Sequence, residues 1–284
     1  MDRVDLHIHT TASDGTVEPE QIPALAMQAG LRAIAVTDHD TVAAVETVQR
    51  CAEPLGLEVL AGIEVSAFYR RREIHILGYH IDIHSSAIAA LTEHCRAQRR
   101  RRNERMVEAM ERDGFDISMQ KLTAAFPGTV IGRPHMARML IEKGYAVSVN
   151  DAFNKYLSWG KPYFVSRELI GAREAIDAIR QGGGIAVLAH PMKYRYEDAD
   201  LPEIFRELKS WGVAGVEALY SRHTPPQTEL LLALAKESGL IVTGGSDFHG
   251  DNKPDIAMGT GLGDLFVGYE AVEKLRRVKV RGEN

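Results

Sequence analysis

The stretch DLHIHTTASDG, residues 5–15, joins a strand-like apolar pattern to two histidines and an aspartate. Side chains two positions apart in a strand point to the same face, so His7 and His9 project together while Ile8 points the opposite way. Two imidazoles on one side of a strand form half of a metal site. A histidine pair alone is equally compatible with a core that satisfies both rings, so the other strands have to decide.

Apolar, β-rich runs alternate with helical patterns along most of the chain, and the helical patterns end near glycines, which commonly stop helices. Near-continuous apolar strands in such an alternation favour a parallel sheet covered by helices. Seven units predict a closed, barrel-like α/β fold, with an open sheet as the alternative. The expected strands are 4–9, 32–38, 57–65, 73–80, 184–190, 214–220 and 240–247.

The segment 99–167 breaks this alternation. A basic helical pattern, RAQRRRRNERMVEAMERDG (96–114), leads into it, and further helical patterns and loops follow. We expect residues 1–98 and 168–284 to form the barrel, and residues 99–167 to form an inserted, mainly helical small domain that covers the substrate. An arginine run of this kind usually forms a solvated helix face, although part of it could line the mouth of a site.

Composition and charge exclude several classes of protein. No apolar run approaches the ~18–20 residues that cross a bilayer, and no signal-peptide pattern opens the chain. Cys51 and Cys95 are too few for a disulfide framework, which favours a reducing cytoplasm. A net charge of −5 argues against duplex DNA as a partner but leaves recognition of a single phosphate open. We expect no membrane association and no obligate protein partner.

Ionisable residues recur on the expected strands, mostly at their carboxyl ends, where the active sites of barrels and parallel sheets gather. Burying so many of them without partners would be very costly. One ion takes about four to six ligands, so this number predicts two or three divalent ions and a bridging carboxylate. Nitrogen and oxygen ligands without thiolate suit Mn²⁺, Fe²⁺ or Zn²⁺. The candidates are His7, His9, Asp14, His39, Glu64, His75, His190, Asp247 and His249.

The order of six motifs resembles that of the PHP (polymerase and histidinol phosphatase) metallo-phosphoesterases. They are DLHIHTTASDG, TDHD (37–40), GIEVS (62–66), HILGYH (75–80), LAHP (188–191) and GGSDFHG (244–250). The resemblance implies the PHP fold, a distorted (β/α)₇ barrel that holds up to three metal ions, with Mn²⁺ as the first expectation and Fe²⁺ or Zn²⁺ as alternatives.

The same resemblance implies a division of the ligands. The first ion would be held by His7, His9, Glu64 and Asp247. Glu64 would bridge to a second ion, held also by His75 and His190. The third would be held by Asp14, His39 and His249. The catalytic members of the set would be Asp14, His39, Glu64, Asp247 and His249.

Two further stretches, GRPHMARMLIEKGY (132–145) and KYLSWGKPYFV (155–165), resemble one branch of that superfamily. Its members remove the 3′-phosphate of nucleoside 3′,5′-bisphosphates and shorten RNA from its 5′ end. The expected substrate is therefore a small nucleotide or the 5′ end of a short RNA.

Because the chain has no P-loop motif, recognition of phosphate falls to cationic side chains in loops and in the insert. The candidates lie in GRPH (132–135), GKPY (160–163) and YSRHTP (220–225), and they are Arg133, His135, Lys161, Arg222 and His223. Trp159 and Tyr163 would either stack on a base or pack in the small domain. Asp38 and Asp40 are expected to point away from His39, with Asp40 as a cap for a helix that starts near Thr41.

Three alternatives remain open at this point. One is a histidinol-phosphate-type or other small-molecule phosphoesterase. Another is a non-catalytic metal-binding module like the PHP domains of some polymerases, which would have lost ligands that this chain keeps. The last is an amide or ring hydrolase, because related barrels share the HxH opening. Such enzymes bridge their metals with a lysine, whereas Glu64 is the bridging candidate here.

Overall fold

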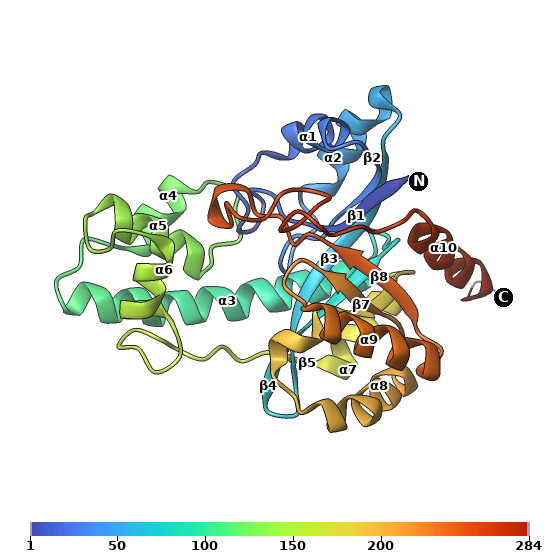
Figure 1. Cartoon of the computed structure of the whole chain (residues 1–284). Coiled ribbons are helices and arrows are strands. Elements are labelled where there is room, and N and C mark those ends of the chain that lie inside the picture. The colour runs from blue at the N-terminus through green and yellow to red at the C-terminus, as the bar shows by residue number, and fades with distance from the viewer. Residues whose placement is uncertain (1, 283–284) are drawn as a thin grey trace.

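The computed structural model describes residues 2–282. A nearly closed, mixed sheet forms the centre of the molecule, with strand order β1-β2-β3-β4-β6-β7-β8 (Figure 1). These strands are β1 (Arg3–Ile8), β2 (Leu31–Val36), β3 (Glu58–Tyr69), β4 (Arg72–Tyr79), β6 (Ile185–Leu188), β7 (Val213–Tyr220) and β8 (Ile241–Gly245). The short β5 (Ile170–Gly171) pairs with β3 outside this order. The predicted α/β barrel is confirmed.

The first and last strands meet at the end of the barrel that carries the histidine motifs. The amide of His9 donates to the carbonyl oxygen of Phe248 at 3.0 Å, and the amide of Asp247 donates to that of His7 at 2.9 Å. Ile8 and Phe248 form a parallel bridge. These contacts join the motif after β1 to the motif after β8.

The expectation of an all-parallel sheet is wrong at β4, which runs antiparallel to both β3 and β6. Only Arg70 and Arg71 connect β3 to β4, with φ angles of 42° and 65°. Such positive values are typical of tight hairpin turns, and two residues cannot form the crossover that parallel strands need. The hairpin sets His75 opposite Ser66, so the early part of β4 reaches the end of the sheet where its parallel neighbours finish.

Helices cover the outside of the sheet (Figure 1). Apolar residues on one face of each helix are buried, as Ala172, Ala175, Ile176 and Ile179 show with helical spacing. These helices are α1 (Ile22–Gln28), α2 (Val45–Ala52), α7 (Ala172–Gln181), α8 (Leu201–Ser210), α9 (Pro225–Ser238) and α10 (Glu270–Gly282). Short 3₁₀ turns are η1 (Pro19–Gln21), η2 (Glu53–Leu55), η4 (Pro191–Tyr194), η5 (Asp198–Asp200) and η6 (Gly250–Asn252). Among residues 2–282, no helix combines the length and apolarity that crossing a membrane requires.

Helix α3 (Ser86–Arg112) extends from the barrel into a separate group of helices (Figure 1). That group contains α4 (Met119–Ala125), α5 (Arg133–Glu142), α6 (Val149–Ala152) and the π-helix η3 (Phe153–Leu157). The early part of α3 buries Ile88 and Cys95 in the barrel core, whereas Met106 and Met110 belong to an apolar cluster made by the group itself. We propose that residues 99–167 form an inserted domain. Along α3, the buried residues leave the barrel core after Cys95 and join the apolar cluster of the group from Met106 on, and the expected boundary at residue 99 lies between them.

Candidate active site

The structure brings all nine candidate ligand residues together at one end of the barrel. They come from β1, β3 and β4 and from the segments that follow β1, β2, β6 and β8. Their nitrogen and oxygen atoms form overlapping groups, in each of which all potential ligand atoms lie within 4.8 Å of one another. The groups are His7, His9, Glu64 and Asp247; His39, Glu64 and His75; His9, Asp14, His39 and His249; and His7, His190 and Glu217.

Glu64 lies at the centre of these groups. Its Oε1 is 2.7 Å from His75 Nδ1 and 2.8 Å from His190 Nε2. Its Oε2 is 3.2 Å from Nε2 of both His7 and His9, and 3.0 Å from His39 Nδ1. The two carboxylate oxygens therefore face different sets of imidazoles, which is the arrangement that a bridging ligand needs.

Several atoms at this centre are buried without a hydrogen-bond partner among residues 2–282. They are His7 Nε2, His9 Nε2, His39 Nδ1 and Glu64 Oε2. An unsatisfied buried polar atom costs roughly 1–3 kcal/mol, and the three ring nitrogens converge on the fourth atom, Glu64 Oε2. A divalent cation is the group that satisfies imidazole nitrogens and carboxylate oxygens together, so the residues present fit bound metal.

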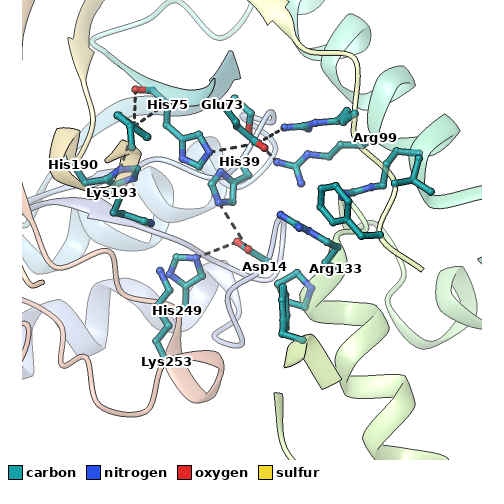
Figure 2. Close-up of a pocket in the computed structure, with 18 residues that line it drawn as sticks. Asp14, His39, Glu73, His75, Arg99, Arg133, His190, Lys193, His249 and Lys253 are labelled. Atoms are coloured by element: carbon teal, nitrogen blue, oxygen red, sulfur yellow. Dashed lines mark hydrogen bonds and ion pairs between the residues drawn. The ribbon is translucent and has the colours of Figure 1, made fainter. Parts of the chain in front are cut away.

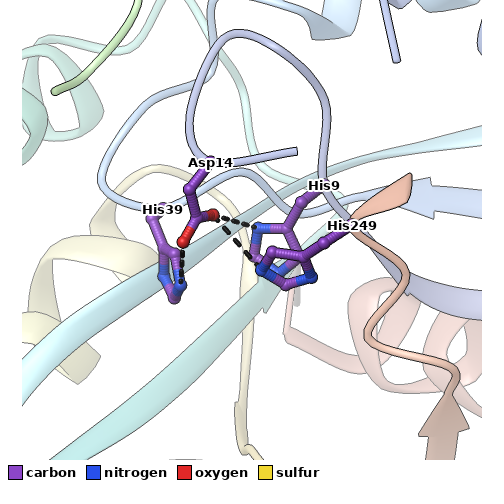
Figure 3. A group of neighbouring side chains, drawn as sticks. All are labelled: His9, Asp14, His39 and His249. Carbon is purple, nitrogen blue, oxygen red and sulfur yellow. Dashed lines mark ion pairs between the residues drawn. The ribbon is translucent and has the colours of Figure 1, made fainter. Parts of the chain in front are cut away.

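A second carboxylate organises the outer part of the centre (Figure 3). Asp14 Oδ1 lies 3.2 Å from His249 Nε2 and 3.7 Å from His9 Nδ1, and its Oδ2 lies 3.8 Å from His39 Nε2. These separations leave room for an ion between the carboxylate and the rings. The group contains the three residues that the family resemblance assigns to a third ion, together with His9, which the resemblance assigns to the first.

Burial on its own would raise the pKa of Glu64, but the nearby rings of His39, His75 and His7 outweigh it and hold that pKa well below its usual range. Burial likewise would lower the pKa of His9, but the carboxylates of Asp247 and Glu64 raise it to about 9. Burial lowers the pKa of His39 to about 3. The carboxylates of the centre are thus ionised and buried, and they need positive charge nearby. A metal ion would supply that charge.

Glu217 on β7 is a part of the centre that the sequence reasoning missed. Its Oε1 accepts from His7 Nδ1 at 2.8 Å, and its Oε2 accepts the backbone N–H of His190 at 2.9 Å. A carboxylate behind a ligating histidine fixes the ring and its tautomer. The available signal was an acidic residue in the otherwise apolar strand AGVEALY (214–220).

The candidate ligands open onto a cavity of about 500 Å³ (Figure 2). Metal-ligand candidates such as Asp14, His75 and His249 line one side of it. Ser66, Glu73 and Tyr194 also line it, and Glu73 Oε1 lies 3.1 Å from Arg167 Nη2. The cationic side chains of the lining are Arg99, Arg102, Arg133, Arg167, Lys193 and Lys253. Its size is in the range that holds a small-molecule ligand.

The arginine side of the cavity carries unbalanced positive charge. Burial and the charges of Arg99, Arg133 and Arg167 lower the pKa of Arg102 well below its usual value. Arg102 itself is buried, with its Nε–H donated to Asn103. Such a cluster is unfavourable without counter-charge, so it favours an anion in the cavity.

Asp40 supplies part of that counter-charge and does not cap a helix, so the expected capping role is wrong. Its buried carboxylate lies 2.6 Å from Arg99 Nε and 2.9 Å from Arg167 Nη1, and it also accepts the amide of Ser66. Its φ of 56° turns the chain at this point, and α2 starts only at Val45. A fully buried carboxylate requires charged partners more than a helix start requires a cap.

Of the five expected phosphate-binding residues, the structure brings Arg133 to this cavity. His135 is buried at the start of α5, where its Nδ1 accepts the amide of Gly132 at 2.9 Å. Lys161 lies in an exposed turn. Arg222 pairs with Asp255 beside a neighbouring cavity, and His223 donates to the carbonyl of Ala218.

The aromatic residues of the insert divide between packing and the cavity. Tyr163 is buried in the apolar cluster of the insert, and its hydroxyl donates to Asp113. Trp159 is exposed and touches Phe164 edge to face. Phe153 and Phe164 line the cavity, and the guanidinium of Arg133 lies over both rings. These two phenylalanines are the flat apolar surfaces available to a base.

Comparison with known proteins shows which family and which relatives this chain resembles. Residues 5–162 match the family model of the PHP domain. A 5′-3′ exoribonuclease of Haemophilus influenzae is 34% identical over 247 residues, which cover 87% of this chain and 90% of the relative. A 3′,5′-nucleoside bisphosphate phosphatase of Chromobacterium violaceum is 31% identical, with 88% of each chain covered.

A phosphoribosyl 1,2-cyclic phosphate 1,2-diphosphodiesterase of Eggerthella lenta is 32% identical over 87% of this chain and 94% of its own. Among solved structures, a protein of Bifidobacterium adolescentis that is provisionally classed as a metal-dependent phosphoesterase superimposes with a TM-score of 0.86. It is 33% identical, and the match covers 96% of this chain and 95% of that one.

Proposed function

The chain belongs to the PHP domain family of metal-dependent phosphoesterases, and from this premise we propose that it removes the 3′-phosphate of nucleoside 3′,5′-bisphosphates. The observation that carries the proposal is a single cavity with two sites for anions. The histidine–carboxylate centre lines one side, and Arg99, Arg102, Arg133 and Arg167 line the other. A molecule with two phosphates matches that arrangement.

Two or three divalent ions would complete the centre, with Mn²⁺ as the first candidate and Fe²⁺ or Zn²⁺ next. When bound, such ions supply an activated water and neutralise the charge of the phosphate oxygens. The residues that would hold them are His7, His9, Asp14, His39, Glu64, His75, His190, Asp247 and His249.

The remaining side chains of the cavity orient the substrate. The arginines bind the 5′-phosphate, because guanidinium groups pair with phosphate oxygens through two hydrogen bonds. Phe153 and Phe164 offer their rings to the nucleoside. The Nζ atoms of Lys193 and Lys253 lie 3.7 Å and 2.6 Å from Asp247 Oδ2, where they add positive charge beside the 3′-phosphate.

The same arrangement accounts for a second activity on RNA. A 5′-phosphate held by the arginines would present the first 3′–5′ linkage of a single strand to the metal centre. Hydrolysis between the 3′-oxygen and phosphorus then yields a nucleoside 5′-monophosphate from either substrate. One site would thus support both activities for which the relatives from Haemophilus and Chromobacterium are named.

The competing activities differ in the charge that their substrates would place beside the arginines and in the metal ligands that they need. Histidinol phosphate carries a cationic amine and one phosphate, so it brings no second anion to the arginine side, where Asp40 and Glu73 are the carboxylates paired with Arg99 and Arg167. A non-catalytic module would need neither the cavity nor the full ligand set. A bridging lysine, which an amide or ring hydrolase would use, is replaced by Glu64, whose two oxygens face different rings.

A substrate comparison tests the proposal. Protein reconstituted with Mn²⁺ is assayed on adenosine 3′,5′-bisphosphate, histidinol phosphate, a ribose 1,2-cyclic phosphate and a 5′-phosphorylated oligoribonucleotide. Phosphorus NMR identifies the products. We expect the bisphosphate to have the highest kcat/KM of the small molecules and to yield adenosine 5′-monophosphate. Preferred hydrolysis of histidinol phosphate or the cyclic phosphate, or release of the 5′-phosphate, would overturn it.

A further inference from the structure

A second cavity, of about 610 Å³, adjoins the active-site cavity. Asp14, Pro134, Phe153, His249 and Lys253 line both. The two spaces are therefore adjacent, and two candidate metal ligands, Asp14 and His249, lie at their common boundary. The proposed hydrolysis of a mononucleotide uses only the first space.

The position of the second cavity gives the pair of cavities a direction. The four arginines line the first cavity and not the second. Asp14 and His249 line both cavities, and Figure 2 shows Asp14 between Arg133 and His249. We expect a strand whose 5′-phosphate is held by the arginines to continue past Asp14 and His249 into the second cavity.

The walls of this cavity come from two parts of the fold. Asn150 and Phe153 belong to the insert, while Arg222 follows β7 and Asn252 follows β8. The side-chain Nδ2 of Asn252 donates to the backbone carbonyl of Asp14 at 2.7 Å, which fixes one wall to the loop that carries this candidate ligand. The volume of this space, about 610 Å³, is within the range of common ligand pockets.

The lining suits single-stranded RNA. Arg222 and Lys253 provide positive charge for a phosphodiester, and Asn150 and Asn252 provide donors and acceptors for a ribose or a base. Arg222 pairs with Asp255 at 2.7 Å, but the side chains are 47% and 50% exposed, so a phosphate can approach the guanidinium from solvent. Exposed ion pairs of this kind are weak and exchange partners readily.

We propose that the second cavity, which we call the downstream groove, binds the nucleotides on the 3′ side of the linkage that is cut. The inference rests on the proposed function and extends it to the path of an RNA strand. In the reaction, the oxygen of water bonds to phosphorus and the bond from phosphorus to the 3′-oxygen of the first nucleotide breaks. That oxygen takes up a proton, and the shortened strand keeps the phosphate as its new 5′ end in the groove.

The test compares substrates that do and do not reach the groove. Wild-type protein and the Arg222→Ala variant, both loaded with Mn²⁺, are assayed on adenosine 3′,5′-bisphosphate and on a 5′-phosphorylated tetraribonucleotide. We expect kcat/KM for the tetranucleotide to fall about tenfold, as for one lost charge-assisted contact. The value for the bisphosphate should change less than about twofold. Arg206→Ala, which removes an exposed arginine on α8, is the matched control.

A second variant gives a change of opposite sign. Asp255→Ala frees Arg222 from its carboxylate partner, so kcat/KM for the tetranucleotide should rise while that for the bisphosphate stays constant. If Arg222→Ala lowers kcat/KM equally for both substrates, or for neither, the proposal of a downstream groove is wrong and the proposed function stands. If wild-type protein hydrolyses neither substrate, the proposed function itself fails.

Discussion

Glu64 Oε2 lies 3.2 Å from His7 Nε2 in the barrel interior, and neither atom has a hydrogen-bond partner within residues 2–282. Glu64 Oε1, in contrast, is within 2.8 Å of rings from β4 and from the segment after β6. One carboxylate therefore joins ligands from opposite sides of the barrel. Its negative charge is the feature on which the metal centre depends most.

Replacement of Glu64 by glutamine should abolish most activity. The change keeps the volume and removes the charge, so we expect kcat/KM to fall by more than about 100-fold, since loss of an outer partner alone costs roughly 10–100-fold. Glu111→Gln on the exposed side of α3 is the matched control. Turnover and elemental analysis are measured together, and a variant that keeps its metal and near wild-type turnover would contradict the assignment.

Glu217→Gln should act through the metal and not through the substrate. The variant loses the charge behind His7, so we expect metal affinity to drop by about 10- to 100-fold while activity returns at saturating Mn²⁺. Titration of activity with Mn²⁺ gives both values. Activity that stays low at saturating metal would show that Glu217 does more than position His7.

Arg133→Ala should separate substrates by their 5′-phosphate. Loss of one charge-assisted contact is worth about 1.5–3 kcal/mol, or roughly 10- to 150-fold in kcat/KM for adenosine 3′,5′-bisphosphate. Adenosine 3′-monophosphate should be affected much less. Arg138→Ala is the control, because this arginine lies on the same helix and is exposed. Equal losses on both substrates would remove Arg133 from the recognition of the 5′-phosphate.

Acid should destabilise the insert through His135. Burial lowers the pKa of this ring to about 4, from an unfolded value near 6.5, so the neutral ring contributes stability that is present above pH 6.5 and is lost as the pH falls toward 4. One proton gives a slope of at most about 1.4 kcal/mol per pH unit. Urea unfolding of wild type and His135→Asn across this range measures it. Equal slopes in both proteins would exclude the effect.

The meeting of the nine candidate ligands was predictable from sequence because they occur in short motifs at strand ends, where backbone geometry alone decides which side chains meet. The alternation at His7 and His9 and the histidines after β6 and β8 are of this kind. The direction of β4 was not predictable in the same way, since it depends on a two-residue turn of two arginines, without the usual glycine or asparagine.

The cationic side of the cavity was less predictable from sequence. Arg99, Arg102 and Arg167 come from the arginine run and from the end of the insert, and only tertiary packing determines which faces of α3 turn inward. Lys161 lies between a glycine and a proline in the same manner as Arg133, yet it lies in an exposed turn away from the cavity. A basic residue in a loop predicts a positive charge there, but not the direction in which its side chain points.

The most direct test of the two-anion cavity is the ratio of kcat/KM for adenosine 3′,5′-bisphosphate to that for adenosine 3′-monophosphate, measured on Mn²⁺-loaded wild-type protein. Several arginine contacts to the 5′-phosphate predict a ratio above about 100, with no turnover after chelation and recovery on return of Mn²⁺. A ratio near one, or full activity in metal-free protein, would contradict the account.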